Sequence, residues 1–265
     1  MMQNPPPRIL TIAGSDSGGG AGVQADLKTI LAMGGYGMSA LTALTAQNTC
    51  EVRGVHPVPA EFVALQIQTV AEDIGVDAAK TGMLHSREVV LAVAETVKGL
   101  IPQLVVDPVM VSKSGARLLE ETAEQALRDE LLPLARILTP NLPETEVLCG
   151  HTVRTRHQMR DAARAILDLG PETVVVKGGH LEDSPVDLFY DGEEFETLDY
   201  KRVETKNTHG TGCTYSAAIA TCLGRGMEPR NAVEVAREAL QRAIENALPL
   251  GHGHGPLNHH VMFER

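Results

Sequence analysis

The feature that most constrains the fold is a regular succession of short apolar runs, each followed by a segment with helical periodicity. Several of these runs lack polar alternation, which is typical of parallel strands that are covered on both faces. The predicted strands are residues 8–14, 39–46, 77–82, 104–109, 136–140 and 173–179. The predicted helices between them are residues 23–33, 60–73, 86–98, 119–132 and 155–169. This order predicts an α/β fold in which helices cover both faces of an open, mostly parallel central sheet.

The pattern changes after residue 179. Residues 186–205 predict a β-hairpin with Asp191 and Gly192 at its turn, because Asp-Gly between apolar runs is a strong hairpin signal. Two helices, residues 212–223 and 228–248, are then expected to complete the chain. No linker-like stretch, repeat or low-complexity segment interrupts the pattern, so we expect one domain over residues 1–265.

Composition and charge argue against two classes of partner. The formal net charge of -11 argues against nucleic acid, because binding to a phosphate backbone needs a basic surface. The uncharged segment 29–50 is long enough to span a membrane. Its glycines, threonines and Gln47-Asn48 nevertheless favour a helix end, a turn and a buried strand. We therefore expect neither nucleic acid nor membrane as a partner.

The cysteines predict a reducing compartment. Cys50, Cys149, Cys213 and Cys222 are widely spaced and form no CxxC pair, which is typical of reduced thiols rather than a disulfide framework or a zinc site. The first ten residues also lack the apolar run of a signal peptide. We expect a cytoplasmic protein.

Polar residues and glycines gather where the predicted strands end. Gly14, Gln47, Asp107, Asn141 and Lys177 each lie at or next to such an end. In open α/β sheets, ligands bind beyond the carboxyl ends of the strands. The sequence therefore predicts one site along this edge. Lys177 ends an otherwise apolar strand, so its ammonium group needs an anionic partner from the protein or from a ligand.

The first of two glycine-rich stretches is AGSDSGGGAGVQAD, residues 13–26. It is not a Walker A loop, because no Gly-Lys-Ser/Thr follows. It fits a loose dinucleotide fingerprint, but the second predicted strand ends without the acidic residue that would hold a ribose. Taken alone, this stretch predicts a plain strand–helix turn and a ligand loop about equally.

The second stretch, residues 207–212, precedes a predicted helix that carries Cys213 in its first turn. A helix N-terminus offers unpaired N–H groups and a positive dipole end, and glycines let an anion approach the backbone. We favour an anion site here over a tight turn with a buried cysteine. The same geometry is expected to lower the pKa of the Cys213 thiol, which could then accept a proton from an attacking hydroxyl.

Three other features have ordinary structural interpretations as well as functional ones. Pro143 and Glu144 suit the first turn of a helix. Asp107, which precedes a proline, would cap a turn or help to hold Mg²⁺ through water. The histidines of residues 251–260 lie among glycines without a carboxylate cluster, so a loop is favoured over a metal site.

Eight motifs occur in order along nearly the whole chain: AGSDSGGGAGVQADLKT, ALTAQNT, KTGML, VVDPVMVSKSG, LTPNLPE, VVKGGH, HGTGC and GHGHGP. Each is weak alone, but the ordered set closely resembles the hydroxymethylpyrimidine/phosphomethylpyrimidine kinases of thiamine biosynthesis, in the ribokinase-like superfamily. The resemblance implies that ATP and Mg²⁺ are used to phosphorylate hydroxymethylpyrimidine to its monophosphate and then to its diphosphate. It also implies a homodimer.

The resemblance further implies roles for residues at the matching motif positions. Gln47 would hydrogen-bond the pyrimidine, in a ring pocket formed by Gly14, Ala21, Asp26, Met83 and Val109. Asp107 and Glu144 would serve the metal, and the ATP-binding residues would be Lys177, Asn141, Thr208 and His209. The catalytic set would be Lys177 with the anion hole of Gly210, Thr211 and Gly212, and Cys213 as the base. The wider superfamily usually has Gly-x-Gly-Asp there, so this sequence carries a thiol in place of a carboxylate.

Two alternatives remain open at this point. A pyridoxal or pyridoxine kinase is the nearest, because that activity occurs in the same superfamily and the pocket around Gln47 and Met83 does not exclude its alcohol. A non-catalytic pyrimidine-binding protein is the second. Lys177, the Asn141 and Glu144 pair, and the glycine loop argue against it, because a binding protein has no need of a phosphate-end constellation.

Overall fold

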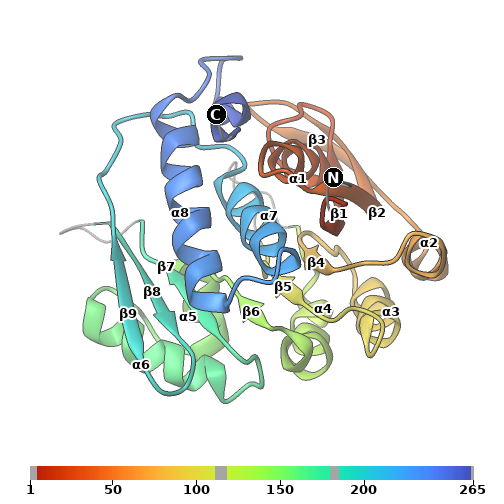
Figure 1. Ribbon diagram of the computed structural model, residues 1–265, viewed down its shortest axis with the longest axis horizontal. Helices are drawn as coiled ribbons and strands as arrows, with labels where there is room; N and C mark the ends of the chain where they lie inside the picture. The colour runs from red at the N-terminus through yellow and green to blue at the C-terminus, as the bar shows by residue number, and fades with distance from the viewer. Residues whose placement is uncertain (1–4, 111–117, 180–184, 264–265) are drawn as a thin grey trace.

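The computed structural model describes residues 5–110, 118–179 and 185–263 (Figure 1). The described strands form one nine-stranded sheet in the order β3-β2-β1-β4-β5-β6-β7-β8-β9. The six central strands from β2 to β7 are parallel, whereas β3, β8 and β9 are antiparallel to their neighbours. Their bounds are β1 Arg8–Asp16, β2 Tyr36–Gln47, β3 Val52–Pro57, β4 Ala78–Thr81, β5 Leu104–Val106, β6 Ile137–Leu138, β7 Val174–Lys177, β8 Val186–Tyr190 and β9 Phe195–Asp199.

Helices cover both faces of this sheet (Figure 1). One face carries α1 Gly22–Ala32, α7 Thr211–Gly224 and α8 Pro229–Glu245, with the 3-10 turn η3 His259–Met262 beside α8. The other face carries α2 Ala60–Asp73, α3 Arg87–Val97, α4 Glu121–Ala126, η1 Leu127–Leu131, η2 Leu132–Leu134, α5 Leu142–Cys149 and α6 Arg156–Leu167. No helix within the described residues combines the length and the apolar character needed to cross a membrane.

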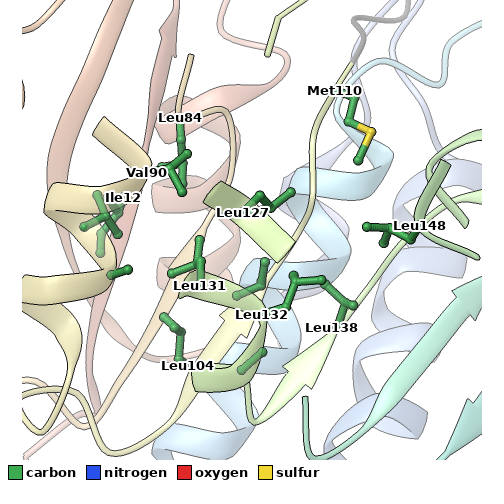
Figure 2. Close-up of a cluster of buried hydrophobic side chains, with 14 of the residues drawn as sticks. Ile12, Leu84, Val90, Leu104, Met110, Leu127, Leu131, Leu132, Leu138 and Leu148 are labelled. Carbon is green, nitrogen blue, oxygen red and sulfur yellow. The ribbon is translucent and has the colours of Figure 1, made fainter. Parts of the chain in front are cut away.

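The central strands direct alternate side chains into two separate hydrophobic clusters. Ile9 and Val105 belong to the cluster with α7 and α8, and their neighbours Leu10 and Val106 belong to the cluster with α2, α3 and α6. Both faces are therefore apolar, which explains why the strands show no polar alternation in the sequence. Figure 2 shows part of the second cluster, in which leucines of the η1–η2 segment lie near Leu138 of β6.

The predicted fold class is confirmed. The six predicted parallel strands and the hairpin at Asp191 and Gly192 are present, and the predicted helices are present with ends shifted by a few residues. β5 ends before Pro108, because a proline cannot donate a ladder hydrogen bond. The helix predicted at 119–132 begins at Glu121, and its last part is a π-helical turn followed by a 3-10 turn that contains Pro133.

The edge strand β3 was not predicted. It pairs antiparallel with β2 and is largely exposed, so its sequence VRGVHP has no burial pattern to reveal it. The parts of the resemblance that fall on residues 111–117 and on His180 lie outside the described residues.

Candidate active site

The carboxyl ends of the parallel strands open into a cavity of about 240 Å³. Its wall includes nearly all the residues that the sequence singled out, although they come from segments far apart in the chain. These are Gly14, Ala21, Gln47, Met83, Asp107, Val109, Asn141, Glu144, Lys177, Thr208, His209, Gly210, Thr211, Gly212 and Cys213. The parallel sheet explains this convergence, because consecutive strands end at the same edge.

Asp26 is the exception among the predicted ring-pocket residues, and its contact with the ring stays a prediction. The side chain is fully buried on α1 and does not line the cavity. It lies 2.9 Å from the ammonium of Lys80, which is also buried, and accepts a hydrogen bond of 2.6 Å from Thr11. Burial raises the pKa of Asp26 while Lys80 opposes that rise. Asp26 and Lys80 form a buried ion pair whose charges also act on Cys213 of the cavity wall.

Lys177 has the anionic partner that its position at the end of β7 requires. Its Nζ lies 2.8 Å from Asp107 Oδ1, and both side chains are largely buried. Burial alone would lower the pKa of Lys177, but the carboxylates of Asp107 and Glu144 raise it above its ordinary value. The ammonium is therefore charged at neutral pH and lies at the cavity wall, where a phosphate can reach it.

The start of α7 lies beside this ion pair. Gly210 caps the helix in the left-handed conformation, with a φ of 85°, and no side chain caps the helix. Within the described residues, the amide N–H groups of Gly212 and Cys213 have no acceptor, as expected at a helix N-terminus. A Cβ added to Gly212 would lie 3.2 Å from Asp107 Oδ2 and 3.5 Å from Lys177 Nζ, so a glycine keeps the helix close to the charged groups.

The lowered pKa expected for Cys213 is wrong. Burial raises the pKa of this thiol to about 11, and the carboxylates of Asp26 and Asp107 add to the rise, while Lys80 opposes it. The helix N-terminus and one lysine do not outweigh desolvation and two nearby negative charges. Cys213 is therefore a neutral thiol in this state.

Asn141 and Glu144 form a capping box at the start of α5. The Asn141 side chain accepts from the Glu144 N–H at 2.9 Å, and the Glu144 carboxylate accepts from the Asn141 N–H at 2.8 Å. Burial raises the pKa of Glu144 to about 7; the negative charge of Asp107 adds to the rise, and Lys177 opposes it. A carboxylate held at such a cost beside another carboxylate indicates a site that a cation would complete.

The donor set fits Mg²⁺. Asp107 and Glu144 supply carboxylate oxygens, which Mg²⁺ prefers, and their mutual repulsion would be relieved by a divalent ion. Among the described residues, no group of three His, Cys, Asp or Glu could hold a metal on its own. Mg²⁺ usually binds one or two carboxylates together with water and substrate phosphates, and two carboxylates are present at this place.

The first glycine-rich loop surrounds an anion that belongs to the protein. Asp16 Oδ1 accepts from Gly18 N at 2.8 Å, and Oδ2 accepts from Gly20 N at 3.1 Å and from Ala21 N at 2.8 Å. The imidazole of His209 lies 2.8 Å from the same Oδ2. Burial raises the pKa of Asp16, but these hydrogen bonds outweigh it and lower the pKa overall. Asp16 was missed in the sequence because nothing local distinguishes it from a turn residue.

A second group of wall residues was also missed. Asp187 on β8 accepts from Gly178 N and from the Tyr200 hydroxyl, each at 3.2 Å. The Arg237 guanidinium of α8 lies 3.6 Å from the centre of the Tyr200 ring, and Tyr215 of α7 lies nearby. Asp187 Oδ1 therefore fixes the backbone directly after Lys177. No motif marks these residues, because they meet only through the packing of α7 and α8 on the sheet.

The fold and the site together define a kinase of the ribokinase-like class: a mostly parallel sheet that directs a lysine, two carboxylates and open helix amides toward one cavity. Residues 16–258 match the family described as phosphomethylpyrimidine kinase. The chain belongs to this family.

Relatives and solved structures agree with this assignment. The chain is 50% identical over 254 residues to a hydroxymethylpyrimidine/phosphomethylpyrimidine kinase of Streptomyces coelicolor, covering 96% of this chain and 94% of that one. It is 51% identical over 253 residues to a thiamine biosynthesis bifunctional protein of Geobacter sulfurreducens, covering 95% of this chain and 52% of that protein. The chain thus spans about half of that relative's length. An ADP complex of Bacillus subtilis pyridoxal kinase superposes with a TM-score of 0.88 at 40% identity, covering 95% of this chain and 96% of that one.

Proposed function

We propose that this kinase transfers the terminal phosphoryl group of ATP to the hydroxymethyl group of 4-amino-5-hydroxymethyl-2-methylpyrimidine, and then transfers a second one to the resulting monophosphate, in thiamine biosynthesis. The observation that carries the proposal is the convergence of Lys177, Asp107 and the open amides of Gly212 and Cys213 at one cavity. The names of the relatives support the choice of substrate.

Phosphoryl transfer depends on positioning the alcohol and ATP and on neutralising the charge of the phosphates. The alcohol oxygen forms a bond to the terminal phosphorus while the bond from that phosphorus to the bridging oxygen breaks, which releases ADP. Through a loose transition state, charge gathers on the transferred phosphoryl oxygens and on the leaving group. The amides at the start of α7 and the ammonium of Lys177 are placed to stabilise that charge.

Asp107 and Glu144 would hold the Mg²⁺ that accompanies ATP. When bound, the ion would supply positive charge that offsets the negative charge of the phosphates. Asn141 fixes the start of α5 and with it the position of the Glu144 carboxylate. Thr208 and Lys177 would contact the nucleotide phosphates, as the motif positions imply.

Cys213 is proposed as the group that takes the proton from the attacking hydroxyl. Because a neutral thiol cannot take up a proton, a pKa of about 11 means that Cys213 acts as a base only in the small fraction of molecules that carry the thiolate. Phosphoryl transfer through a loose transition state makes little demand on a base, so a small thiolate fraction suffices.

The pyrimidine ring is proposed to lie at the part of the cavity wall opposite the phosphate-binding groups. Gln47 offers a carboxamide to the pyrimidine, and Gly14, Ala21, Met83 and Val109 are its apolar surroundings. Gly14 makes room there, because an added Cβ would lie 3.1 Å from the sulfur of Met83. The monophosphate would turn its own phosphate toward the start of α7, so that the same groups serve both steps.

The test is product analysis with ATP, Mg²⁺ and hydroxymethylpyrimidine. Phosphorus NMR should detect the monophosphate first and the diphosphate later, with one ADP released at each step. A chain that forms neither product would refute the proposal. A Lys201→Ala variant, at an exposed lysine outside the cavity wall, is the matched control for variants of Lys177.

Pyridoxal phosphorylation is a second candidate. The observation that favours it is the similarity to Bacillus subtilis pyridoxal kinase, at a TM-score of 0.88. Measuring kcat/KM for pyridoxal and for hydroxymethylpyrimidine with one preparation separates the two. A higher value for pyridoxal would make that alcohol the principal substrate. Membership of a kinase family argues against the non-catalytic alternative.

The assembly is proposed to be a homodimer of single-domain chains in the cytoplasm, as the resemblance implies. Light scattering after size-exclusion chromatography tests it directly: a mass of two chains supports the dimer, and a mass of one chain rejects it. Neither result affects the proposed chemistry, because the cavity wall described above comes from one chain.

A further inference from the structure

A buried network joins the two glycine-rich loops at the cavity wall. The side chain of Asp16 is 4% exposed and that of His209 is 11% exposed, and their Oδ2 and Nε2 atoms are 2.8 Å apart. Hydrogen bonds from three loop amides and from His209 keep the pKa of Asp16 below its ordinary value, so the carboxylate is ionised at neutral pH. An ionised carboxylate can only accept hydrogen bonds. His209 must therefore carry a hydrogen on Nε2.

This assignment determines what His209 can do for Gln47. The carboxamide nitrogen of Gln47 lies 3.4 Å from the same Nε2. A ring nitrogen that donates to Asp16 cannot also accept a hydrogen from Gln47. The imidazole therefore lies next to the Gln47 amide without accepting a hydrogen bond from either of its N–H groups. Ser17, on the same loop as Asp16, exchanges hydrogen bonds of 2.9 Å with the backbone of Gln47. The Thr45 hydroxyl donates to the Gln47 carboxamide oxygen at 3.2 Å.

The imidazole and its backbone pack against the first glycine-rich loop. A Cβ added to Gly20 would lie 2.5 Å from His209 Cδ2, so the ring lies directly on the glycine. A Cβ added to Gly210 would overlap the carbonyl oxygen of Gly20. The residue after His209 thus also touches the first loop. The backbone N–H of His209 donates to Gly255 O at 3.1 Å.

We propose that Asp16 is a positioning residue for the alcohol substrate and acts through His209. Its carboxylate fixes the hydrogen of the imidazole on Nε2, and this leaves the Gln47 amide available to a hydrogen-bonding group on the ring of a heterocyclic alcohol. The identity of that alcohol rests on the proposed function. The motif resemblance places His209 with the nucleotide, whereas these contacts assign its ring to the alcohol end of the cavity.

The first experiment needs no activity. In the full-length protein labelled with ¹⁵N in histidine, long-range proton–nitrogen spectra at pH 8 should show the His209 imidazole with its hydrogen on Nε2. The His209→Gln variant identifies the signal by its loss. In Gly20→Ala, whose new methyl group displaces the ring from Asp16, the hydrogen should no longer be confined to Nε2. A wild-type imidazole with its hydrogen on Nδ1 alone would overturn the proposal.

The second experiment separates the two substrates. Asp16→Asn should raise the KM for hydroxymethylpyrimidine by about tenfold, the size expected when the imidazole accepts one hydrogen bond from the Gln47 amide. His209→Ala removes that acceptor and should raise this KM by less than about threefold. The KM for ATP should change by less than about threefold in both variants, because the network does not reach the nucleotide phosphates. The double variant should resemble His209→Ala, since Asp16 acts through His209.

Control variants and outcomes distinguish a failure of this inference from a failure of the proposed function. Lys28→Ala removes an exposed contact of 2.7 Å to Gly19 O in the same loop and should leave both KM values unchanged. If Asp16→Asn does not fold, Gly20→Ala should reproduce its KM pattern. A raised KM for ATP with an unchanged KM for the alcohol would place His209 at the nucleotide and reject the inference. If the wild type phosphorylates no pyrimidine alcohol, the proposed function fails, while the nitrogen spectrum still decides the role of Asp16.

Discussion

Replacing Glu144 by glutamine is expected to make the protein more stable and less active at pH 8. The side chain is 5% exposed, and its pKa is raised by burial and by the negative charge of Asp107, with Lys177 in opposition. Glutamine keeps the carbonyl oxygen that accepts from Asn141 N at 2.8 Å, so the capping box survives the change. The substitution therefore removes mainly a buried negative charge.

The magnitude follows from the pKa. The value rises from 4.5 in its ordinary state to about 7 in the folded protein. That difference corresponds to roughly 3 kcal/mol of unfolding free energy. The folded state holds this proton more tightly than the unfolded state does, so ionisation favours unfolding. The destabilisation is absent below pH 4.5, grows as the pH rises, and is complete above about pH 7. Glutamine does not ionise, so the amount by which the variant's unfolding free energy exceeds that of the wild type should grow over the same pH range.

Urea unfolding at pH 5 and at pH 8 measures this difference. EDTA should be present, because a bound cation would stabilise the wild type alone. We expect Glu144→Gln to exceed the wild type by roughly 3 kcal/mol at pH 8 and by much less at pH 5. Glu95→Gln, at an exposed position on α3, is the matched control and should behave as the wild type at both values. A variant that is less stable than the wild type at pH 8, or whose advantage is equal at both values, would refute the reasoning.

The same variant should be a poorer kinase. In the proposed metal site Mg²⁺ would lose one of two carboxylates without the Glu144 charge, and we expect a roughly 10- to 100-fold loss of activity with a raised Mg²⁺ requirement. A more stable but less active variant is the behaviour of a residue retained for function at the expense of stability. Unchanged activity at saturating and at low Mg²⁺ would remove Glu144 from the metal site.

Three further predictions concern buried charges and the thiol. Cys213→Ala should lower kcat at least about a hundredfold if the thiol takes the proton. Because its pKa is about 11, the wild-type kcat should then still rise with pH above neutrality; a loss of only a few-fold would reject that role. Lys177→Ala should slow both phosphorylations, measured separately with the alcohol and with its monophosphate, and an effect on one step alone would contradict shared machinery. Lys80→Met should leave Asp26 as a buried, uncompensated charge and cost roughly 3–5 kcal/mol in urea unfolding, and an unchanged midpoint would contradict that.

Features that depend on local pattern could be predicted from the sequence. The strands that end at Lys177 and directly before Asp107 are apolar on both faces, so their runs are continuous and easy to recognise. Because parallel strands end at one edge, a polar residue at each end indicates a common site before any contact is known. Asn141 with Glu144 three residues later is a capping-box pattern, and the structure has that capping box.

Features that depend on distant partners could not be predicted. Asp26 lies within a motif, yet its partner Lys80 is on another strand, so its burial away from the cavity has no local signal. The pKa of Cys213 depends on charges from three segments, and the helix terminus alone suggested the wrong sign. Arg237 and Tyr200 lie far apart in the sequence and meet over one face of the sheet.

The two glycine-rich loops show what the local sequence can and cannot predict about an anion site. Both expose backbone N–H groups that suit an anion, and by sequence alone either one could hold a phosphate. In the first loop Asp16 already occupies that position and accepts hydrogen bonds from Gly18, Gly20 and Ala21. At the start of α7 no described side chain caps the amides, and the nearest charged groups are Lys177 and Asp107. We therefore expect an external phosphate at the second loop, and propose that the first loop, through His209, determines the surroundings of Gln47.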